Sequence, residues 1–76
     1  MLDKNIFGAR IKALRTSLKI SQSTLGEILN VSKTQISDIE NAKTTTTLEK
    51  AYLVADYFNV SVDYLLGRTD NPKINK

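Results

Sequence analysis

Between residues 5 and 19 the apolar side chains recur at the spacing of one helical face. Phe7, Ile11, Leu14 and Leu18 are separated by four, three and four positions, which is the period of an α-helix with one buried side. The pattern predicts a first helix over residues 5–19, packed on the core through these four side chains.

A short second helix follows the first. Ser21 offers a side-chain oxygen at the position of an N-cap, and Leu25, Ile28 and Leu29 form an apolar face. Asparagine tolerates a left-handed turn better than most residues other than glycine. The helix is therefore predicted to begin after Ser21 and to end at Asn30.

The third helix is predicted from its cap, Ser32, to the neighbourhood of Asn41, because Ile36 and Ile39 share one helical face. Four consecutive threonines occupy positions 44–47. A polar, β-branched stretch of this kind is typical of a loop that ends in an N-cap.

The helical period returns in the second half of the chain, where it predicts a fourth helix that stops at Asn59. Its apolar positions are Leu48, Ala51, Val54, Ala55 and Phe58. Ser61 then opens a short fifth helix over residues 62–66, which Gly67 closes.

These elements define the fold class. No strand-like alternation of apolar and polar residues is found, so the fold is predicted to be all-α, a compact bundle of about five short helices. One domain is expected over residues 1–68, because a chain of 76 residues has room for a single core. Residues 69–76 hold the only proline, Pro72, and almost no apolar residue, which predicts a flexible tail or linker stub.

The second and third predicted helices are joined by only a few residues around Asn30, which indicates a helix-turn-helix. Gly26 lets the third helix cross closely, and Val31 helps to attach the pair to the core. Short helical hairpins also occur in bundles that bind no nucleic acid, so the spacing alone leaves both interpretations open.

The outward face of the third helix is polar. At about 100° per residue, Thr34, Ser37, Asp38 and Asn41 lie away from Ile36. Short donors and acceptors of this kind can meet base edges in a major groove. The alternative is a solvated surface, although such surfaces more often consist of Lys and Glu, which favour helices.

Glu40 is predicted to lie beside the buried stripe of the third helix, where an unpaired carboxylate would be costly. Arg15 flanks the apolar face of the first helix. We therefore expect a partly buried ion pair between Arg15 and Glu40 that fixes the first helix against the third.

Gln22 comes one residue after the cap of the second helix. Its side-chain amide could bind a phosphate together with the free N–H groups of that helix. A merely solvated glutamine is the equal alternative.

The composition narrows the classes of function. With no cysteine and no histidine, disulfides and the usual zinc sites are excluded, and no metal or other cofactor is expected. Nothing in the sequence activates a nucleophile, so an enzyme with a small-molecule substrate is the least favoured function. No run approaches membrane-spanning length and no export signal is visible, so a cytoplasmic protein without membrane association is expected.

The net charge of +3 permits a polyanionic partner without requiring one. Residues 1–20 carry five cations against one acid, Asp3. A basic helix is more often a solvated surface than a nucleic-acid site, so the charge alone does not show whether the protein binds nucleic acid.

The stretch SQSTLGEILNVSKTQISDIEN at 21–41, together with VADYFNVSVDYLLG at 54–67, resembles the Cro and phage-repressor (xenobiotic response element) family of helix-turn-helix regulators. The resemblance covers roughly residues 6 to 68. It implies a lambda-repressor-like fold and a two-fold homodimer on a palindromic operator of double-stranded DNA.

The resemblance also implies roles for individual residues. Arg15 and Glu40 match a structural salt bridge of the family. Positions implied to face bases are Lys33, Thr34, Ser37 and Asp38; those implied to contact phosphates are Gln22, Ser32, Asn41, Lys43 and Thr44.

Three departures from the family pattern matter. Gly26 stands where the family prefers Ala, which costs helix propensity of roughly 1 kcal/mol. Ala42 replaces the usual Gly after the third helix, so Asn41 is expected to take the left-handed turn. The threonines at 44–47 replace a loop that often contains Pro, which changes the phosphate contacts of that loop.

The favoured function is a sequence-specific regulator of transcription, of which a phage or mobile-element repressor is the preferred kind. The alternative is a protein-interaction module, such as an antitoxin whose toxin binds the last helix. That alternative predicts an exposed apolar face around Tyr57, Tyr64 and Leu65.

A dimer is expected because one half-site supplies few contacts. The candidate interface lies near the fifth helix and consists of Tyr57, Val62, Leu65 and Leu66. It would place two third helices one duplex turn, roughly 34 Å, apart. Alternatively, these side chains complete the core, and the dimer forms only on DNA or through another domain.

Overall fold

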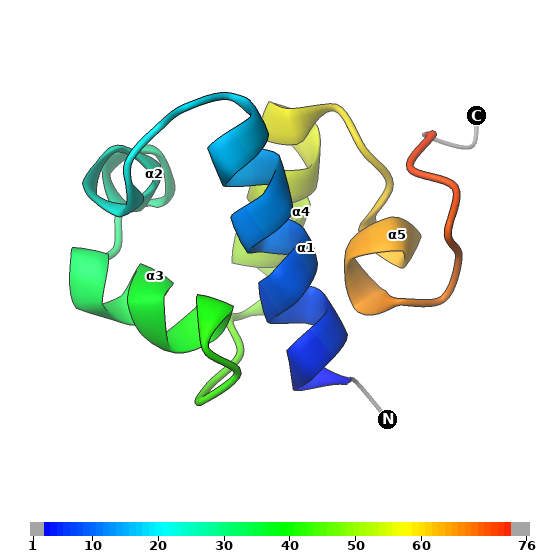
Figure 1. Ribbon diagram of the computed structural model, residues 1–76, viewed down its shortest axis with the longest axis horizontal. Helices are drawn as coiled ribbons and strands as arrows, with labels where there is room; N and C mark the ends of the chain where they lie inside the picture. Colours follow the sequence, from blue (N-terminus) through cyan, green and yellow to red (C-terminus); the bar gives the residue numbers. More distant parts are fainter. Residues whose placement is uncertain (1–2, 74–76) are drawn as a thin grey trace.

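The computed structural model of the protein describes residues 3–73. Within this range the structure contains five helices and no strand: α1 (Lys4–Ser17), α2 (Gln22–Leu29), α3 (Lys33–Glu40), α4 (Leu48–Phe58) and α5 (Val62–Leu66). Figure 1 shows α1 in the middle of the molecule, with α2 and α3 on one side, α5 on the other and α4 behind it. The prediction of an all-α fold with five short helices is confirmed.

Each helix begins at a side chain that accepts hydrogen bonds from the backbone of its first turn. Ser21 accepts from the amide of Thr24 and Ser32 from that of Gln35. The complete set of N-caps is Asp3, Ser21, Ser32, Thr47 and Ser61. The caps at Ser21, Ser32 and Ser61 and at the end of the threonine loop are therefore confirmed.

Three helices end in a left-handed residue at the positions that the sequence predicts. Asn30 closes α2 with φ 58°, Asn59 closes α4 with φ 57° and Gly67 closes α5 with φ 81°. A left-handed terminus lets the next amides return to the last carbonyl groups of the helix. The amide of Val31, for example, donates to the carbonyl oxygen of Gly26 at 2.8 Å.

The end of α3 differs from the expectation. Asn41 has φ −92° and ψ 10°, and it is Ala42 that adopts the left-handed conformation, with φ 62°. The expectation that Asn41 would take this turn is wrong, because the amide of Asn41 still donates to the carbonyl oxygen of Ser37 at 2.9 Å, as in a helix, and the chain reverses one residue later. The amide of Lys43 then donates to the carbonyl oxygen of Asp38 at 2.9 Å.

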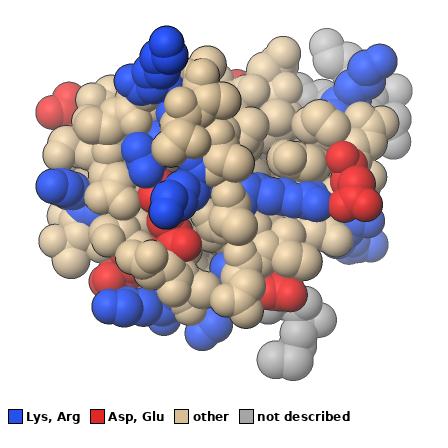
Figure 2. Space-filling view, viewed as in Figure 1, with Lys and Arg blue, Asp and Glu red and all other residues tan. Residues whose placement is uncertain are grey.

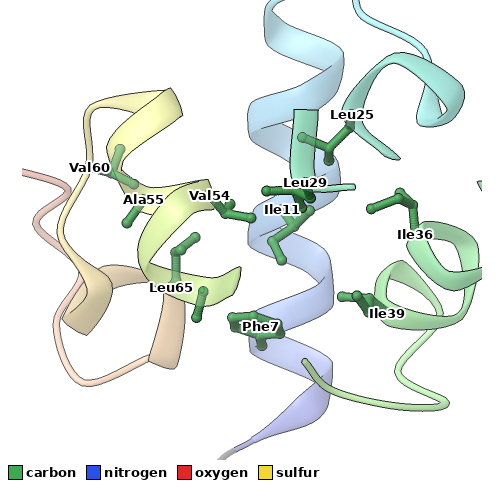
Figure 3. Packing of buried hydrophobic residues seen from close by; sticks show 11 residues of the cluster. Phe7, Ile11, Leu25, Leu29, Ile36, Ile39, Val54, Ala55, Val60 and Leu65 are labelled. Carbon is green, nitrogen blue, oxygen red and sulfur yellow. The ribbon is translucent and has the colours of Figure 1, made fainter. Parts of the chain in front are cut away.

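All five helices contribute to one hydrophobic core. Figure 3 shows α1 at its centre, with Phe7 and Ile11 facing buried side chains of the other helices. The full set of buried apolar residues is Phe7, Ile11, Leu25, Leu29, Ile36, Ile39, Ala51, Val54, Ala55, Val60 and Leu65.

Three side chains assigned to apolar helix faces are exposed instead: Leu18, Ile28 and Leu48. Leu18 follows the last residue of α1, Ile28 lies at the edge of the buried face of α2, and Leu48 is the first residue of α4. Helical periodicity identifies the buried side of a helix, but it does not show where a neighbouring helix stops covering that side.

The structure corrects one residue of the candidate dimer interface. Leu65 is fully buried, with 0% of its surface exposed, so it is a core residue and cannot contact a second chain in this fold. Val62 and Leu66 are half-buried and pack against the same core. Tyr57 on α4 is the exposed member of the set. A five-residue helix has too few positions for both a core face and a wide apolar outer face.

The segment after α5 is held against the domain as far as Pro72. The carbonyl oxygen of Pro72 accepts from the amide of Ser61 at 2.9 Å, and the Arg10 guanidinium donates to the carbonyl oxygen of Thr69 at 2.6 Å. The sequence predicts a flexible tail here and indicates none of these contacts. Residues 74–76 of that tail lie outside the described residues. In the described part of the chain, no helix is long and apolar enough to cross a membrane.

Candidate nucleic-acid interface

The turn between α2 and α3 depends on a close backbone approach at Gly26. A Cβ atom at this position would lie 2.7 Å from the carbonyl oxygen of Val31. A real Cβ atom does not approach an oxygen so closely without a shift of the backbone. The small residue at Gly26 therefore lets α3 begin directly beside α2, as the sequence predicts.

A second close approach, at Gly8, positions α3 against α1. A Cβ atom on Gly8 would overlap the carbonyl oxygen of Ile39 and lie 2.9 Å from that of Glu40. The sequence analysis missed Gly8. The sequence did contain an indication of this contact, because Gly8 lies inside a predicted helix. A glycine there destabilises the helix by about 1 kcal/mol relative to alanine, and it often marks a close contact with another element.

A buried ion pair joins the same two helices. The Nε atom of Arg15 donates to Oε2 of Glu40 at 2.6 Å, and Nη2 donates to Oε1 at 3.0 Å. The side chains are 12% and 2% exposed. Nη1 of Arg15 donates to the carbonyl oxygen of Ile20 at 2.9 Å. The structure thus brings Arg15 and Glu40 together in a two-pronged contact that leaves the guanidinium well satisfied.

The environment of Arg15 favours its charged form. The hydrogen bond to Glu40 raises the pKa of Arg15, burial opposes this effect, and the negative charge of Glu40 adds to it. The net result is a pKa above the usual value. The guanidinium therefore keeps its charge, and the ion pair its attraction, far above neutral pH.

Gln22 completes this buried network. Its Nε2 atom donates to Oε1 of Glu40 at 3.1 Å, so one amide hydrogen of Gln22 is directed toward α3. An amide nitrogen carries two hydrogens. The second amide hydrogen of Gln22 can therefore donate to a phosphate oxygen or a water molecule, while the amide oxygen can accept only from a donor such as water.

The outward face of α3 carries the predicted base-facing side chains. Lys33 and Thr34 in the first turn are exposed, while Ser37 and Asp38 in the second turn are half-buried. Nδ2 of Asn41 donates to Oγ of Ser37 at 3.3 Å. The face carries both donors and acceptors, and Thr34, Ser37 and Asp38 are short enough for a second surface to approach the helix closely.

The predicted phosphate-binding residues differ in their exposure and in the hydrogen bonds that their side chains already make. Oγ of Ser32 already accepts from Gln35 as the cap of α3, and the hydroxyl of Thr44 donates to the carbonyl oxygen of Thr45 at 3.1 Å. Lys43 and Asn41 are exposed beside the end of α3. Lys43 is therefore the member of this group that offers an exposed positive charge.

On the visible face of the molecule, positive charge does not gather in a single patch. On the face shown in Figure 2, basic side chains are spread over the molecule and acidic side chains lie among them. Arg10, one of the five cations of the first twenty residues, is 20% exposed and bound within the domain. A ligand would thus be positioned by individual contacts around α3 more than by a broad basic field.

Comparisons with known proteins agree with this geometry. A family model described as helix-turn-helix matches residues 11–65. The HTH-type transcriptional regulator YobD of Bacillus subtilis (strain 168) is 33% identical over 63 residues, which are 83% of this chain and 56% of the relative. Repressor protein C2 of Salmonella phage P22 is 35% identical over 65 residues, which are 86% of this chain and 30% of the relative.

A solved structure is also similar. The crystal structure of the P22 c2 repressor in complex with the synthetic operator 9T superposes with a TM-score of 0.75 and 38% identity, covering 79% of this chain and 91% of that chain. By contrast, the chain spans 56% and 30% of the full lengths of the two sequence relatives. The shared region is the part that contains the helix-turn-helix.

Proposed function

This chain belongs to the helix-turn-helix family of Cro and phage-repressor type, and we propose that it is a sequence-specific regulator of transcription that binds double-stranded DNA. Within that function we favour a repressor of phage or mobile-element type. The proposed DNA-binding domain is residues 1–68, and residues 69–76 are its tail.

The observation that carries the proposal is the polar outward face of α3, presented by a helix that the core holds rigidly. Ile36 and Ile39 are buried, and Glu40 is bound to α1 and α2 through Arg15 and Gln22. A side chain that distinguishes bases must be held in a fixed position relative to the groove. The solved P22 repressor complex, in which a similar fold is bound to an operator, supports double-stranded DNA as the ligand.

We assign base contacts to four residues of α3: Lys33, Thr34, Ser37 and Asp38. Asp38 can accept from a cytosine amine and would repel a phosphate, so it favours base reading over backbone binding. The proposed phosphate contacts are Gln22, Ser32, Asn41, Lys43 and Thr44. Gln22 would use the amide hydrogen that Glu40 does not occupy.

We also propose that two copies bind a palindromic operator. The contact between them would use the partly exposed surfaces of Val62 and Leu66, because Leu65 is buried. Only small apolar surfaces are available there, so the dimer is expected to be weak without DNA. Sedimentation of the chain with and without a palindromic duplex measures this directly. A single chain on each duplex would contradict the dimer.

Selection of bound duplexes from a random pool tests the function. We expect enrichment of an inverted repeat whose half-sites are about one helical turn apart. We also expect binding to weaken steeply with salt. A pool that shows no enriched sequence while the protein remains folded would contradict sequence-specific binding.

A further inference from the structure

The exposed apolar side chains of the domain are concentrated on one helix that has no part in the proposed DNA contact. In the described part of the chain, six large apolar residues are exposed, and four of them belong to α4: Leu48, Tyr52, Leu53 and Tyr57. Tyr52 is 62% exposed and Leu53 is 40% exposed. A cluster of this size on so small a domain suggests a surface that is covered in use.

These four side chains form two rows along the helix. At about 100° per residue, Leu48 and Tyr52 form one row, and Leu53 and Tyr57 form the other. Two acidic residues, Glu49 and Asp56, lie between the rows and are exposed. The α4 outer face, as we call these six residues, is therefore an acidic stripe between two apolar rows.

The α4 outer face contains no cation, although the chain as a whole has a net charge of +3. The helix has one basic residue, Lys50. Its Nζ atom donates to the carbonyl oxygen of Leu29 at 2.6 Å, so this charge is bound to the end of α2. Lys50 therefore does not neutralise Glu49 and Asp56 across the stripe.

The α4 outer face is supported by the core beneath it. Ala51, Val54 and Ala55 on the opposite side of the helix are buried. The ring of Tyr57 packs edge-on against that of Phe58, with 5.2 Å between centroids, and Phe58 in turn packs on the core. A partner would therefore meet one aromatic ring, that of Tyr57, that is already packed against the domain before binding.

A second copy of this chain does not fit the α4 outer face. In a two-fold contact each acidic stripe would face an identical acidic stripe, and burying like charges opposite one another is unfavourable. A partner with cations between apolar side chains would match both the charge and the rows. Tyr57, which the sequence assigns to the dimer, belongs to this face.

We propose that the α4 outer face binds an amphipathic helix of another protein, one that carries a row of Lys or Arg flanked by apolar side chains. Figure 3 places Val54 and Ala55 of α4 and Ile36 and Ile39 of α3 on opposite sides of α1. Binding at α4 therefore leaves α3 free. The inference does not depend on DNA binding, and its test uses no DNA.

The test is an NMR titration of the full chain with a synthetic amphipathic helix that has leucines and alanines flanking a central row of lysines. A peptide with glutamates in place of the lysines is the control. We expect the lysine peptide to shift amide signals of residues 48–57, and the glutamate peptide to leave them in place. Shifts centred on other exposed apolar residues, such as Leu18 and Ile28, would overturn the proposal.

Charge reversal makes the test specific. The double variant Glu49→Lys/Asp56→Lys should weaken binding of the lysine peptide by at least about tenfold. The neutral variant Glu49→Gln/Asp56→Asn should give a smaller loss, and it guards against a reversal that fails to fold. The matched control Glu27→Lys/Asp63→Lys, which reverses exposed acids on α2 and α5, should bind within about twofold of the unaltered chain.

Two further results would overturn the proposal. One is equal affinity of the folded charge variants and the unaltered chain, which would mean that the peptide adheres through its leucines alone. The other is a shift of the α4 amide signals when the chain is concentrated without peptide, which would assign the face to a second copy.

Discussion

Arg10 and Arg15 lie five positions apart on α1, yet they stabilise the two halves of the molecule in different ways. Arg15 faces α2 and α3 and forms a buried ion pair with Glu40, whose side chain is 2% exposed. Arg10 faces α5 and the tail, and its acidic partner, Asp70, is fully exposed. An ion pair with an exposed partner contributes little, because water competes with both charges.

The strength of the Arg10 site comes from other contacts. Its Nη1 atom donates to the carbonyl oxygens of Tyr64 and Thr69 at 2.5 and 2.6 Å. The guanidinium also lies over the ring of Tyr64, 4.1 Å from its centroid. Arg10 therefore acts mainly as a hydrogen-bond donor to the end of the short helix α5 and as a cation over an aromatic ring.

The comparison shows that, in addition to the shared hydrophobic core, a buried ion pair joins α1 to α3, whereas hydrogen bonds to backbone carbonyl groups join α1 to α5 and the tail. Substitutions should separate the two modes. Removing the acid Glu40 should strongly lower the free energy of unfolding, whereas removing the acid Asp70 should leave it unchanged. Removing either arginine should lower it.

The largest effect is expected for Glu40→Ala. The substitution leaves the Arg15 guanidinium buried without its acid, which costs about 3–5 kcal/mol in comparable sites. Native domains have total stabilities of only about 5–15 kcal/mol, so we expect the variant to lose a large part of its free energy of unfolding. Urea denaturation followed by circular dichroism measures this, with the exposed Glu27→Ala as control. Equal stability of the two variants would contradict a structural role for the pair.

Gly8→Ala should come next. The added methyl group meets the carbonyl oxygens of Ile39 and Glu40, and α1 must move away from α3. Overpacking of this kind costs about 2 kcal/mol, net of the better helix propensity of alanine. Asn5→Ala places the same side chain on the exposed surface of α1 and should not destabilise. Thermal melting of both variants measures the difference. A Gly8→Ala protein with the melting temperature of the unaltered chain would show that α1 and α3 are not in close contact.

Arg10→Met should cost about 1–2 kcal/mol, because two partly buried carbonyl oxygens lose their donor. Asp70→Ala should leave the melting temperature unchanged. Hydrogen exchange gives a local measurement, since the amide of Ser61 bonds to Pro72. Its exchange should accelerate in Arg10→Met. If Asp70→Ala were the more damaging change, the ion pair would be the main contact after all.

Ala42→Gly should have the smallest effect, with the opposite sign. Ala42 has φ 62°, a conformation that disfavours side chains, so glycine should stabilise the domain by up to about 1 kcal/mol. The same replacement in the exposed middle of α1, Ala13→Gly, should destabilise by a similar amount. Denaturant titration of Ala42→Gly and Ala13→Gly measures whether the two changes in the free energy of unfolding have opposite signs. Destabilisation by both variants would contradict the left-handed turn at Ala42.

The contrast between the two arginines also shows how far sequence predicts this structure. Helix positions and the Arg15–Glu40 pair follow from periodicity, because both residues flank apolar stripes that must meet. The contacts of Arg10 do not follow, since its main partners are backbone carbonyl groups, which every residue has. The exposure of Leu48 and the burial of Leu65 depend on where neighbouring helices end, and no pattern within one helix contains that information.

The central claim is that α3 distinguishes DNA sequences, and the most direct test compares base preferences of alanine variants on the selected operator. Thr34→Ala and Asp38→Ala should each alter the preference at one position of a half-site by about 1–3 kcal/mol. Lys43→Ala should weaken all sequences alike and reduce the slope of affinity against salt by about one. Identical operator preferences in the unaltered protein, Thr34→Ala and Asp38→Ala would contradict the account.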